Sequence, residues 1–439
     1  MWEFFLSLAY FLVFLWLIHR WKFFQLPAVT RPMLMAFFGL KVLAGVSLTL
    51  VYTYYYTDRT TADVFKYFDD SAIMFDALFT APGDYFRMVF GIGHEGPRFT
   101  SLYYTNMNSW IRTFETSVYN DSHTIIRLNA VFRLFSFGHF QVHTIFMAFI
   151  SFLGQVLIFR ALQPFFRGKL RLLAGGIFML PSVLFWSSGV LKEGLLFLAI
   201  GLVVQAFFEL VHDRVRVWPF LRLLPGLGIL LILKFYILVA FLPAGMAYAW
   251  SHRGPSNGQY WKYPAVLIAC TLLTLQVQHV VPGFHVPSVL VQKQQDFIRH
   301  AAFLNSGSQI AIPELEPTAG SLMRHAPMAA ANTLLRPFPW DVNSSLMLLA
   351  CGENALLLLI LSLCLWFRLP WSAMHRNLFF FLMVYTIAVF ILIGWTTPVT
   401  GAIVRYKVPA LPFLVAGFLL VLDPDKLLKN RPRLAKMLS

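Results

Sequence analysis

Residues 62–78, ADVFKYFDDSAIMFDAL, hold a concentration of negative charge that is unusual for this chain. Four aspartates fall here, Asp63, Asp69, Asp70 and Asp76, although the 439 residues include only 20 acidic ones. Close carboxylates can raise the pKa of one of them and create a general base, and their oxygens can also hold a divalent cation. The stretch therefore predicts acid–base chemistry or a metal site, with a merely solvated helix face as the alternative.

The spacing within this stretch predicts an amphipathic helix. Its apolar residues recur at intervals of four, three and four and form one stripe: Phe68, Ala72, Phe75 and Phe79. Asp63, Tyr67 and Asp70 form a separate polar stripe with Asp69 beside it, and Lys66 is placed to pair with Asp70 one turn away. The candidate catalytic residues are Asp63, Asp69 and Asp70, and Asp69 and Asp70 are also the candidate metal ligands.

Two apolar stretches carry cations at points where a helix should break. In LPSVLFWSSGVLKEGLLFLAIG, residues 180–201, a turn at 187–189 leads to Lys192 and Glu193. A helix N-terminus with an adjacent lysine suits a phosphate, although a plain Lys–Glu surface pair is the alternative. Lys234, in LILKFYILVAFLP, is expected at the tip between two apolar segments, either as a substrate contact or as a snorkelling lysine.

A third cationic stretch lies near the C-terminus, TPVTGAIVRYKVPALPFL at residues 397–414. Gly401 and two prolines predict a turn before the last helix, with Arg405 and Lys407 at its end. An arginine fork and a lysine charge match a phosphate, and a structural ion pair with Glu353 is the alternative. In LLRPFPWDVNSS, Arg336 beside aromatic residues suits sugar binding or an interfacial aromatic belt.

The elements that must position these residues are membrane helices. The chain is 58% hydrophobic and 13% charged, well below the roughly 25% charged residues of soluble proteins. Many apolar runs approach the length that spans a bilayer. The sequence predicts an all-α polytopic membrane protein of about 11 transmembrane helices, at about 2–18, 33–55, 141–163, 172–187, 192–211, 220–233, 236–250, 263–280, 345–367, 378–395 and 407–422.

The basic residues alternate between the predicted spans in a way that orients the chain. The clusters that fall on one side are Arg20, Lys22 and Arg31; Arg167, Lys169 and Arg171; Arg214, Arg216 and Arg222; Arg253 and Lys262; Arg368 and Arg376; and the tail DPDKLLKNRPRLAKMLS. By the positive-inside rule this side is the cytoplasm, so the N-terminus faces out and the C-terminus faces in. Topology largely accounts for the net charge of +15, so nucleic acid is not needed as a partner.

Two long loops then fall on the extracytoplasmic side, at about 56–140 and 281–344. The first holds nine of the 20 acidic residues, among them Glu115, and seven cations, among them Arg112. Neither loop has the alternation of a soluble β-domain. We expect short helices packed on the membrane surface, with the aromatics of the acidic helix among the headgroups, within a single integral-membrane domain covering 1–439.

An N-terminal span that leads into an outside loop with the pattern D…Y..D resembles the GT-C superfamily of integral-membrane glycosyltransferases. The stretches FWSSG.LKE and RYK.P.LPF are also similar to chains of this layout. The resemblance implies a multi-pass protein of the bacterial inner membrane that uses polyprenyl-phosphate-linked sugars. It also implies that Asp63, Asp69 or Asp70 acts as catalytic base or as ligand of a divalent cation, Mg²⁺ or Mn²⁺.

The leading hypothesis is therefore an enzyme that moves a sugar from a polyprenyl phosphate to a glycan, lipid or protein acceptor on the outer face, in cell-envelope polysaccharide synthesis. Tyr67, Lys192, Glu193, Lys234, Arg336, Arg405 and Lys407 are its candidate substrate-binding residues. Two alternatives stay open: a polymerase or ligase of lipid-linked repeats, in which basic residues such as Arg336 matter most, and a lipid or solute transporter without enzymatic activity.

Overall fold

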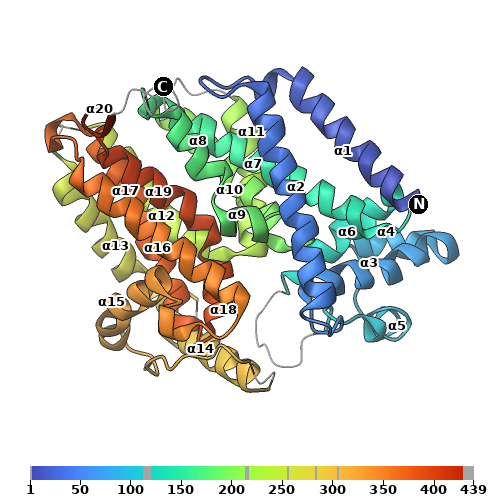
Figure 1. Cartoon of the computed structure of the whole chain (residues 1–439). Coiled ribbons are helices and arrows are strands. Elements are labelled where there is room, and N and C mark those ends of the chain that lie inside the picture. Colours follow the sequence, from blue (N-terminus) through green and yellow to red (C-terminus); the bar gives the residue numbers. More distant parts are fainter. Residues whose placement is uncertain are drawn as a thin grey trace. The chain divides into compact units, whose positions relative to one another are not determined.

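The computed structural model is all-α, which confirms the fold class predicted from the sequence (Figure 1). It describes residues 2–111, 120–212, 217–254, 257–281, 284–303 and 306–428, and within these ranges it contains no β-strand. Some residues that entered the sequence predictions lie outside the described ranges: Arg112, Glu115, Arg214, Arg216 and the tail 429–439.

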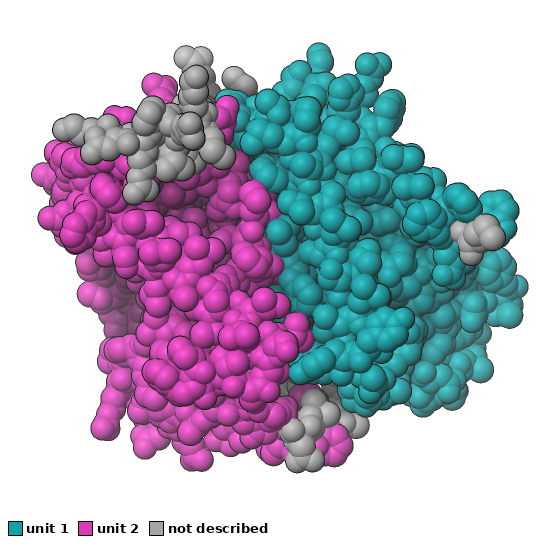
Figure 2. Space-filling model, viewed as in Figure 1, with its two compact units in different colours: residues 1–161, 183–206, 216–234 teal, residues 162–182, 207–215, 235–439 magenta. Residues whose placement is uncertain are grey.

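The chain divides into two compact units, coloured separately in Figure 2. Unit 1 comprises residues 1–161, 183–206 and 216–234, and unit 2 comprises residues 162–182, 207–215 and 235–439. The prediction of one integral-membrane domain over 1–439 stays a prediction.

Unit 1 contains the first two apolar helices and the acidic loop. Its helices are α1 (Trp2–Arg20), α2 (Arg31–Tyr54), α3 (Asp63–Thr80), α4 (Pro82–Phe90), α5 (Pro97–Leu102), α6 (Ser122–Ser136), α7 (Phe140–Leu162), most of α9 (Pro181–Trp186) and of α10 (Lys192–His212), and α11 (Val217–Leu233). Helix α3 packs on α4 and α6, and its apolar residues join a core with residues from α2, α7 and α10. The long loop predicted at 56–140 is thus a helical layer with its own buried side chains.

Two glycines allow α7 and α10 to approach each other closely. A Cβ atom on Gly154 of α7 would lie 2.2 Å from the carbonyl oxygen of Phe197, and a Cβ on Gly201 of α10 would lie 2.4 Å from the carbonyl oxygen of Gly154. Small residues at helix contacts are the usual means by which membrane helices pack tightly. Replacement of either glycine would force these two backbones apart.

Unit 2 contains most of the C-terminal half of the chain. Its helices are α8 (Leu170–Phe178), α12 (Phe235–His252), α13 (Gln259–Val280), α14 (Val286–Phe303), α15 (Ala319–Leu335), α16 (Ser345–Trp366), α17 (Arg376–Thr396), α18 (Thr400–Tyr406), α19 (Leu411–Val421) and α20 (Pro424–Leu428). Helix α17 packs on α12, α15 and α19. Its Gly394 faces the carbonyl of Ala329, which a Cβ would approach to 2.1 Å, so only glycine fits there.

Eight segments of the described chain are long and apolar enough to cross a membrane, in support of the predicted multi-pass protein. They are Trp2–Arg20, Arg31–Tyr54, Phe140–Phe165, Lys192–His212, Gln259–Val280, Ser345–Trp366, Arg376–Thr396 and Thr400–Val421. These segments match eight of the eleven predicted spans, with ends that differ by up to seven residues, as at the start of the last one, predicted at 407 and found at Thr400.

The other three predicted spans are shorter or interrupted. The segment predicted at 172–187 breaks into α8 and α9, because Pro181 lacks an amide hydrogen and disfavours helical backbone at the residue before it. The segments predicted at 220–233 and 236–250 form α11, with 17 residues, and α12, with 18 residues, separated by Lys234. The turn predicted at 187–189 is confirmed, and α10 begins at Lys192.

Candidate functional site

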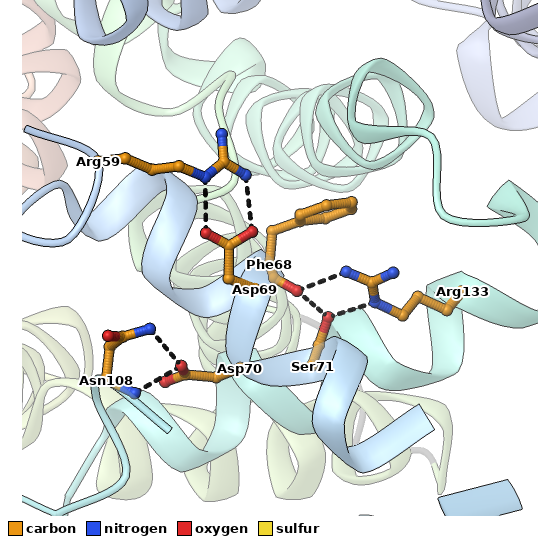
Figure 3. A network of polar contacts seen from close by, with 7 residues as sticks. All are labelled: Arg59, Phe68, Asp69, Asp70, Ser71, Asn108 and Arg133. Carbon is orange, nitrogen blue, oxygen red and sulfur yellow. Dashed lines mark hydrogen bonds and ion pairs between the residues drawn. The ribbon is translucent and has the colours of Figure 1, made fainter. Parts of the chain in front are cut away.

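Helix α3 is held in unit 1 by a buried arginine of α6. The Nε atom of Arg133 donates to the hydroxyl of Ser71 at 2.8 Å, and a terminal nitrogen donates to the carbonyl of Phe68 at 2.7 Å (Figure 3). The guanidinium also lies 4.1 Å from the centroid of the Phe68 ring. Burial lowers the pKa of Arg133 to about 10, although the nearby charges of Asp69 and Asp76 raise it. The arginine therefore fixes the orientation of the acidic helix.

The aromatic residues of α3 were predicted to lie among the membrane headgroups, and for Phe68 this prediction is wrong. Phe68 is buried and packs edge-on against Phe140 and His143, at centroid distances of 5.1 and 4.8 Å. The predicted polar stripe is also mostly internal, since Tyr67 and Asp70 are both buried. Helix α3 is amphipathic as predicted, but more of its circumference is covered by protein than the periodicity indicates.

Asp70 is fully buried and serves as an acceptor for a neighbouring loop. Its carboxylate accepts from the backbone amides of Asn108 and Ser109, both at 2.7 Å, and from the Asn108 side chain at 3.1 Å. The predicted pair with Lys66 does not form, because these amides occupy the carboxylate instead. Burial raises the pKa of Asp70, and the hydrogen bonds from Asn108 and Ser109 lower it in part. The geometry suits a residue that holds residues 108–109 in position.

Asp69 points to a different partner from its neighbour, as Figure 3 shows. Arg59 binds both of its carboxylate oxygens, with nitrogen–oxygen distances of 2.8 and 2.6 Å. The Asp69 side chain is 34% exposed, in contrast to the buried Asp70, so solvent or a substrate can reach it. Asp63 is the first residue of α3 and is partly buried. Among the three candidate bases, Asp69 combines exposure with a fixed orientation.

Three of the predicted substrate-binding residues come together around an aspartate. Lys192, the first residue of α10, lies 2.7 Å from a carboxylate oxygen of Asp121, and Lys234 lies 3.8 Å from the other oxygen. The Lys192 nitrogen also lies 5.3 Å from the centroid of the Tyr67 ring. The three charged side chains are largely buried. We call Tyr67, Asp121, Lys192 and Lys234 the lysine cluster.

The lysine cluster lies where apolar helices end. Lys192 opens a candidate span, Lys234 directly follows α11, and Asp121 directly precedes α6. Such a group of cations at the end of membrane helices suits the phosphate of a lipid. Glu193, the second residue of α10, directly follows Lys192 in the chain and is buried. Asp121 entered the sequence analysis only as one acidic residue of the loop, because its partners are distant along the chain.

The remaining candidates belong to unit 2. Lys407 is buried, and its side-chain nitrogen donates to the Asn354 side chain at 2.7 Å and to the carbonyl oxygen of Arg336 at 3.2 Å. One terminal nitrogen of Arg336 lies 2.9 Å from each carboxylate oxygen of Asp341. The turn predicted around Gly401 is instead helix α18, which also carries Arg405. Lys407 and Arg336 are thus occupied by contacts within the protein.

Glu353 faces the protein interior, as expected for a carboxylate within a predicted span. It forms no ion pair within the described residues, although its charge interacts with that of Lys407. Its oxygens accept from the backbone amide of Ser182, at 3.0 Å, and from the Ser182 hydroxyl. The predicted divalent-cation site at Asp69 and Asp70 has little geometric support. No group of three or more His, Cys, Asp or Glu side chains suited to a metal ion occurs in the described part of the chain.

A buried lysine escaped the sequence analysis. Lys41 lies in the middle of α2, is fully buried, and donates to the hydroxyl of Ser187 at 2.6 Å. It is the one charged residue between positions 33 and 55 in the sequence. A charge inside an apolar span commonly marks a functional residue, so this position could have been identified from the sequence.

The acidic loop of unit 1 also forms a pocket of about 470 Å³. Its walls include His94, Tyr104, Trp110, His123 and Arg127. The Nε2 atom of His94 lies 3.0 Å from the guanidinium of Arg127, which can only donate, so the imidazole proton is on Nδ1. Nδ1 then donates to the Tyr104 hydroxyl at 2.9 Å, and that hydroxyl donates to the His94 carbonyl at 2.8 Å. Burial lowers the pKa of His94, and the charge of Arg127 lowers it further.

Comparisons of the chain with protein-family models, with curated proteins and with solved structures found no match.

Proposed function

We propose that this protein is a GT-C-like glycosyltransferase that takes a sugar from a polyprenyl phosphate on the extracytoplasmic face of a bacterial inner membrane. The lysine cluster is the observation that carries the proposal. It groups two cations and an aromatic ring at the ends of apolar helices, in the same unit as the acidic helix. A lipid-linked sugar phosphate needs these two kinds of group: cations for the phosphate and a carboxylate for the acceptor hydroxyl.

In the proposed reaction, the acceptor hydroxyl oxygen attacks the anomeric carbon of the sugar. The bond from that carbon to the phosphate oxygen breaks, and the polyprenyl phosphate leaves with the bonding electrons. Lys192 and Lys234 stabilise the charge that grows on the departing phosphate. Asp69 takes the proton of the acceptor hydroxyl, and Asp63 is the second candidate for this role.

Other features of the sequence prediction fit the proposal as further hypotheses. The N-terminus would face the outside and the C-terminus the cytoplasm, with α8–α9, α11 and α12 also within the membrane to complete eleven segments. The sequence also suggests phosphate contacts by Arg405 and Lys407 and a sugar contact by Arg336. The contacts of Lys407 and Arg336 within unit 2 favour a structural role for both.

The test is an assay of the purified full-length protein in lipid nanodiscs. Farnesyl-phosphate esters of pentoses and hexoses are supplied with a mixed glycan acceptor, and release of farnesyl phosphate is measured by mass spectrometry. We expect release with at least one sugar, and loss of release in Asp69→Asn. Asp76→Asn, an exposed change on the same helix, is the matched control and should keep the activity. Absence of release with every donor would contradict the proposal.

The same preparation distinguishes the transporter alternative. Proteoliposomes that move a fluorescent polyprenyl phosphate between leaflets without cleaving its sugar would favour transport. Acceptor chains lengthened by whole lipid-linked repeats, with Asp69→Asn still active, would favour the polymerase alternative.

A further inference from the structure

The pocket in the acidic loop is separate from the lysine cluster in its lining residues, and its volume of about 470 Å³ lies in the range of small-molecule sites. All of its lining residues fall between Gly91 and Arg127, outside the candidate membrane spans. The pocket is therefore formed by the helical layer of unit 1 and can admit a molecule from the aqueous side.

Arg127 brings a positive charge to this pocket, whose lining also includes Glu95. Its Nε atom donates to the carbonyl of Met88 at 2.8 Å, and one terminal nitrogen is bound to His94 at 3.0 Å. Its guanidinium also lies 5.5 Å from the centroid of the Trp110 ring. These partners are all uncharged, and Arg127 forms no ion pair within the described residues. The guanidinium is thus held in place, and its second terminal nitrogen can donate a hydrogen bond to a ligand.

The walls around Arg127 are rigid as well. The Trp110 ring is stacked between Tyr104 and His123, with ring centroids 4.5 and 3.7 Å away. The Trp110 carbonyl lies 2.9 Å from the Nε2 atom of His123 and accepts from the Asn120 side chain at 3.0 Å. A preorganised arginine loses little entropy when it binds, which favours recognition of a planar or tetrahedral anion.

Two glycines with positive φ angles, Gly91 and Gly96, also line the pocket. Gly91 has φ of +72°, and a Cβ there would lie 3.2 Å from the Arg127 guanidinium. Gly96 has φ of +114°, and a Cβ there would point into open space. Any other residue at these two positions would strain the backbone, and at Gly91 it would press on the arginine.

We propose that this pocket binds a sugar-sized ligand through a carboxylate or phosphate group that pairs with Arg127. The ring hydroxyls of such a ligand would meet the polar wall side chains Thr100 and Glu95. The inference rests on the proposed function, because it assigns the pocket to an acidic sugar unit of the acceptor glycan. It requires only binding, so it can fail while sugar transfer from the lipid donor stands.

The test is ligand-detected NMR on the full-length protein in nanodiscs, with glucuronic acid, glucose 6-phosphate, glucose and inorganic phosphate as probes. We expect the two acidic sugars to bind at least about tenfold more tightly than glucose and than inorganic phosphate, because a charge-assisted pair is added to contacts of the ring. Equal binding of glucose, or binding of inorganic phosphate as tight as that of glucose 6-phosphate, would overturn the proposal.

Two variants assign the binding to this pocket. Arg127→Gln should weaken binding of both acidic sugars about tenfold, whereas Arg87→Gln, an exposed change on α4, should leave it unchanged. Thr100→Phe fills the pocket without touching the hydrogen bonds of Arg127 and should also abolish binding, which keeps the test decisive where Arg127→Gln does not fold. Unaltered binding in folded Thr100→Phe contradicts the assignment.

Discussion

The side-chain nitrogen of Lys41 lies 2.6 Å from the hydroxyl oxygen of Ser187. Lys41 is in the middle of α2, where the residues around it are largely apolar. Both side chains are fully buried. The Ser187 hydroxyl in turn donates to the carbonyl of Val183, so the three groups form a short chain of hydrogen bonds between α2 and the turn before α10. This contact ties the N-terminal half of unit 1 to the segment that leads into Lys192.

The first prediction concerns this contact. Ser187→Ala should lower the free energy of unfolding by about 1–3 kcal/mol, because Lys41 is left as a buried donor without its partner. Lys41→Met should be neutral or stabilising, since an apolar side chain of similar size replaces a buried polar one. Thermal unfolding of the purified protein in one detergent measures both variants.

The double variant Lys41→Met with Ser187→Ala completes the cycle. If the contact is the reason for the loss in Ser187→Ala, the double variant should be nearly as stable as Lys41→Met alone. Simple addition of the two single effects would show that the two side chains are not coupled.

The second prediction separates the neighbouring aspartates. Asp70→Ala should cost about 2–3 kcal/mol of stability, because the buried amides of Asn108 and Ser109 lose a charged acceptor. Asp69→Asn should change stability by less than about 1 kcal/mol, since its ion pair with Arg59 is largely exposed. Hydrogen exchange at residues 108–109 should increase only in Asp70→Ala, and protection that stays unchanged there would refute the positional role of Asp70.

The third prediction concerns the lysine cluster. Lys192→Gln should raise KM for the lipid-linked donor about tenfold or more through loss of a phosphate contact. Lys192 also pairs with Asp121, so its replacement could act merely by leaving that carboxylate unpaired. The double variant Lys192→Gln with Asp121→Asn removes both charges: a phosphate contact predicts that KM stays high, and a purely structural pair predicts recovery.

The fourth prediction is a loss of stability on acidification through His94. Burial and Arg127 lower its pKa below the ordinary 6.5, while Glu95 raises it in part. As the pH falls below 6.5, the unfolded chain takes up a proton on this imidazole before the folded chain does, so the folded state loses relative stability. Above 6.5 both states are neutral at this position, and no effect is expected.

The measurement is the midpoint of thermal unfolding between pH 5 and 8. His94→Gln keeps an acceptor for Arg127 and should show a flatter decline toward pH 5 than the unaltered protein. His19→Gln, an exposed change in the last turn of α1, is the control and should decline like the unaltered protein. An identical slope in His94→Gln would exclude this histidine as the cause.

Most helices could be predicted from the sequence because their signal is local. A run of apolar residues such as 192–211 needs no partner to identify it, and the structure begins and ends that helix within one residue of the prediction. The segment predicted at 172–187 failed because it was treated as one run. Pro181 breaks the helix, and the carboxylate of Glu353, which is also in unit 2, accepts a hydrogen bond from the backbone amide of Ser182 at that break.

The candidate site was less predictable, because its contacts join residues far apart in the chain. Helical spacing placed Tyr67 and Asp70 on one face, but it could not reveal that the amides of residues 108–109 cover that face. Likewise the sequence indicated Lys192 and Lys234 separately. In the structure both contact Asp121, which lies 71 residues before Lys192 in the chain. Interaction partners of this kind depend on tertiary packing, which a single sequence does not disclose.

The start of helix α9 has a consequence for the order in which the chain can mature. The backbone amide of Ser182 donates to the carboxylate of Glu353, a residue of α16 that is synthesised 171 residues later. Until α16 has been synthesised and inserted, the Ser182 amide, at the break between α8 and α9, lacks this hydrogen-bond acceptor. The hydrogen bonds at the start of α9 are therefore complete only once α16 is in place, and a nascent chain arrested before residue 353 should leave the Ser182 amide to water or to the insertion machinery.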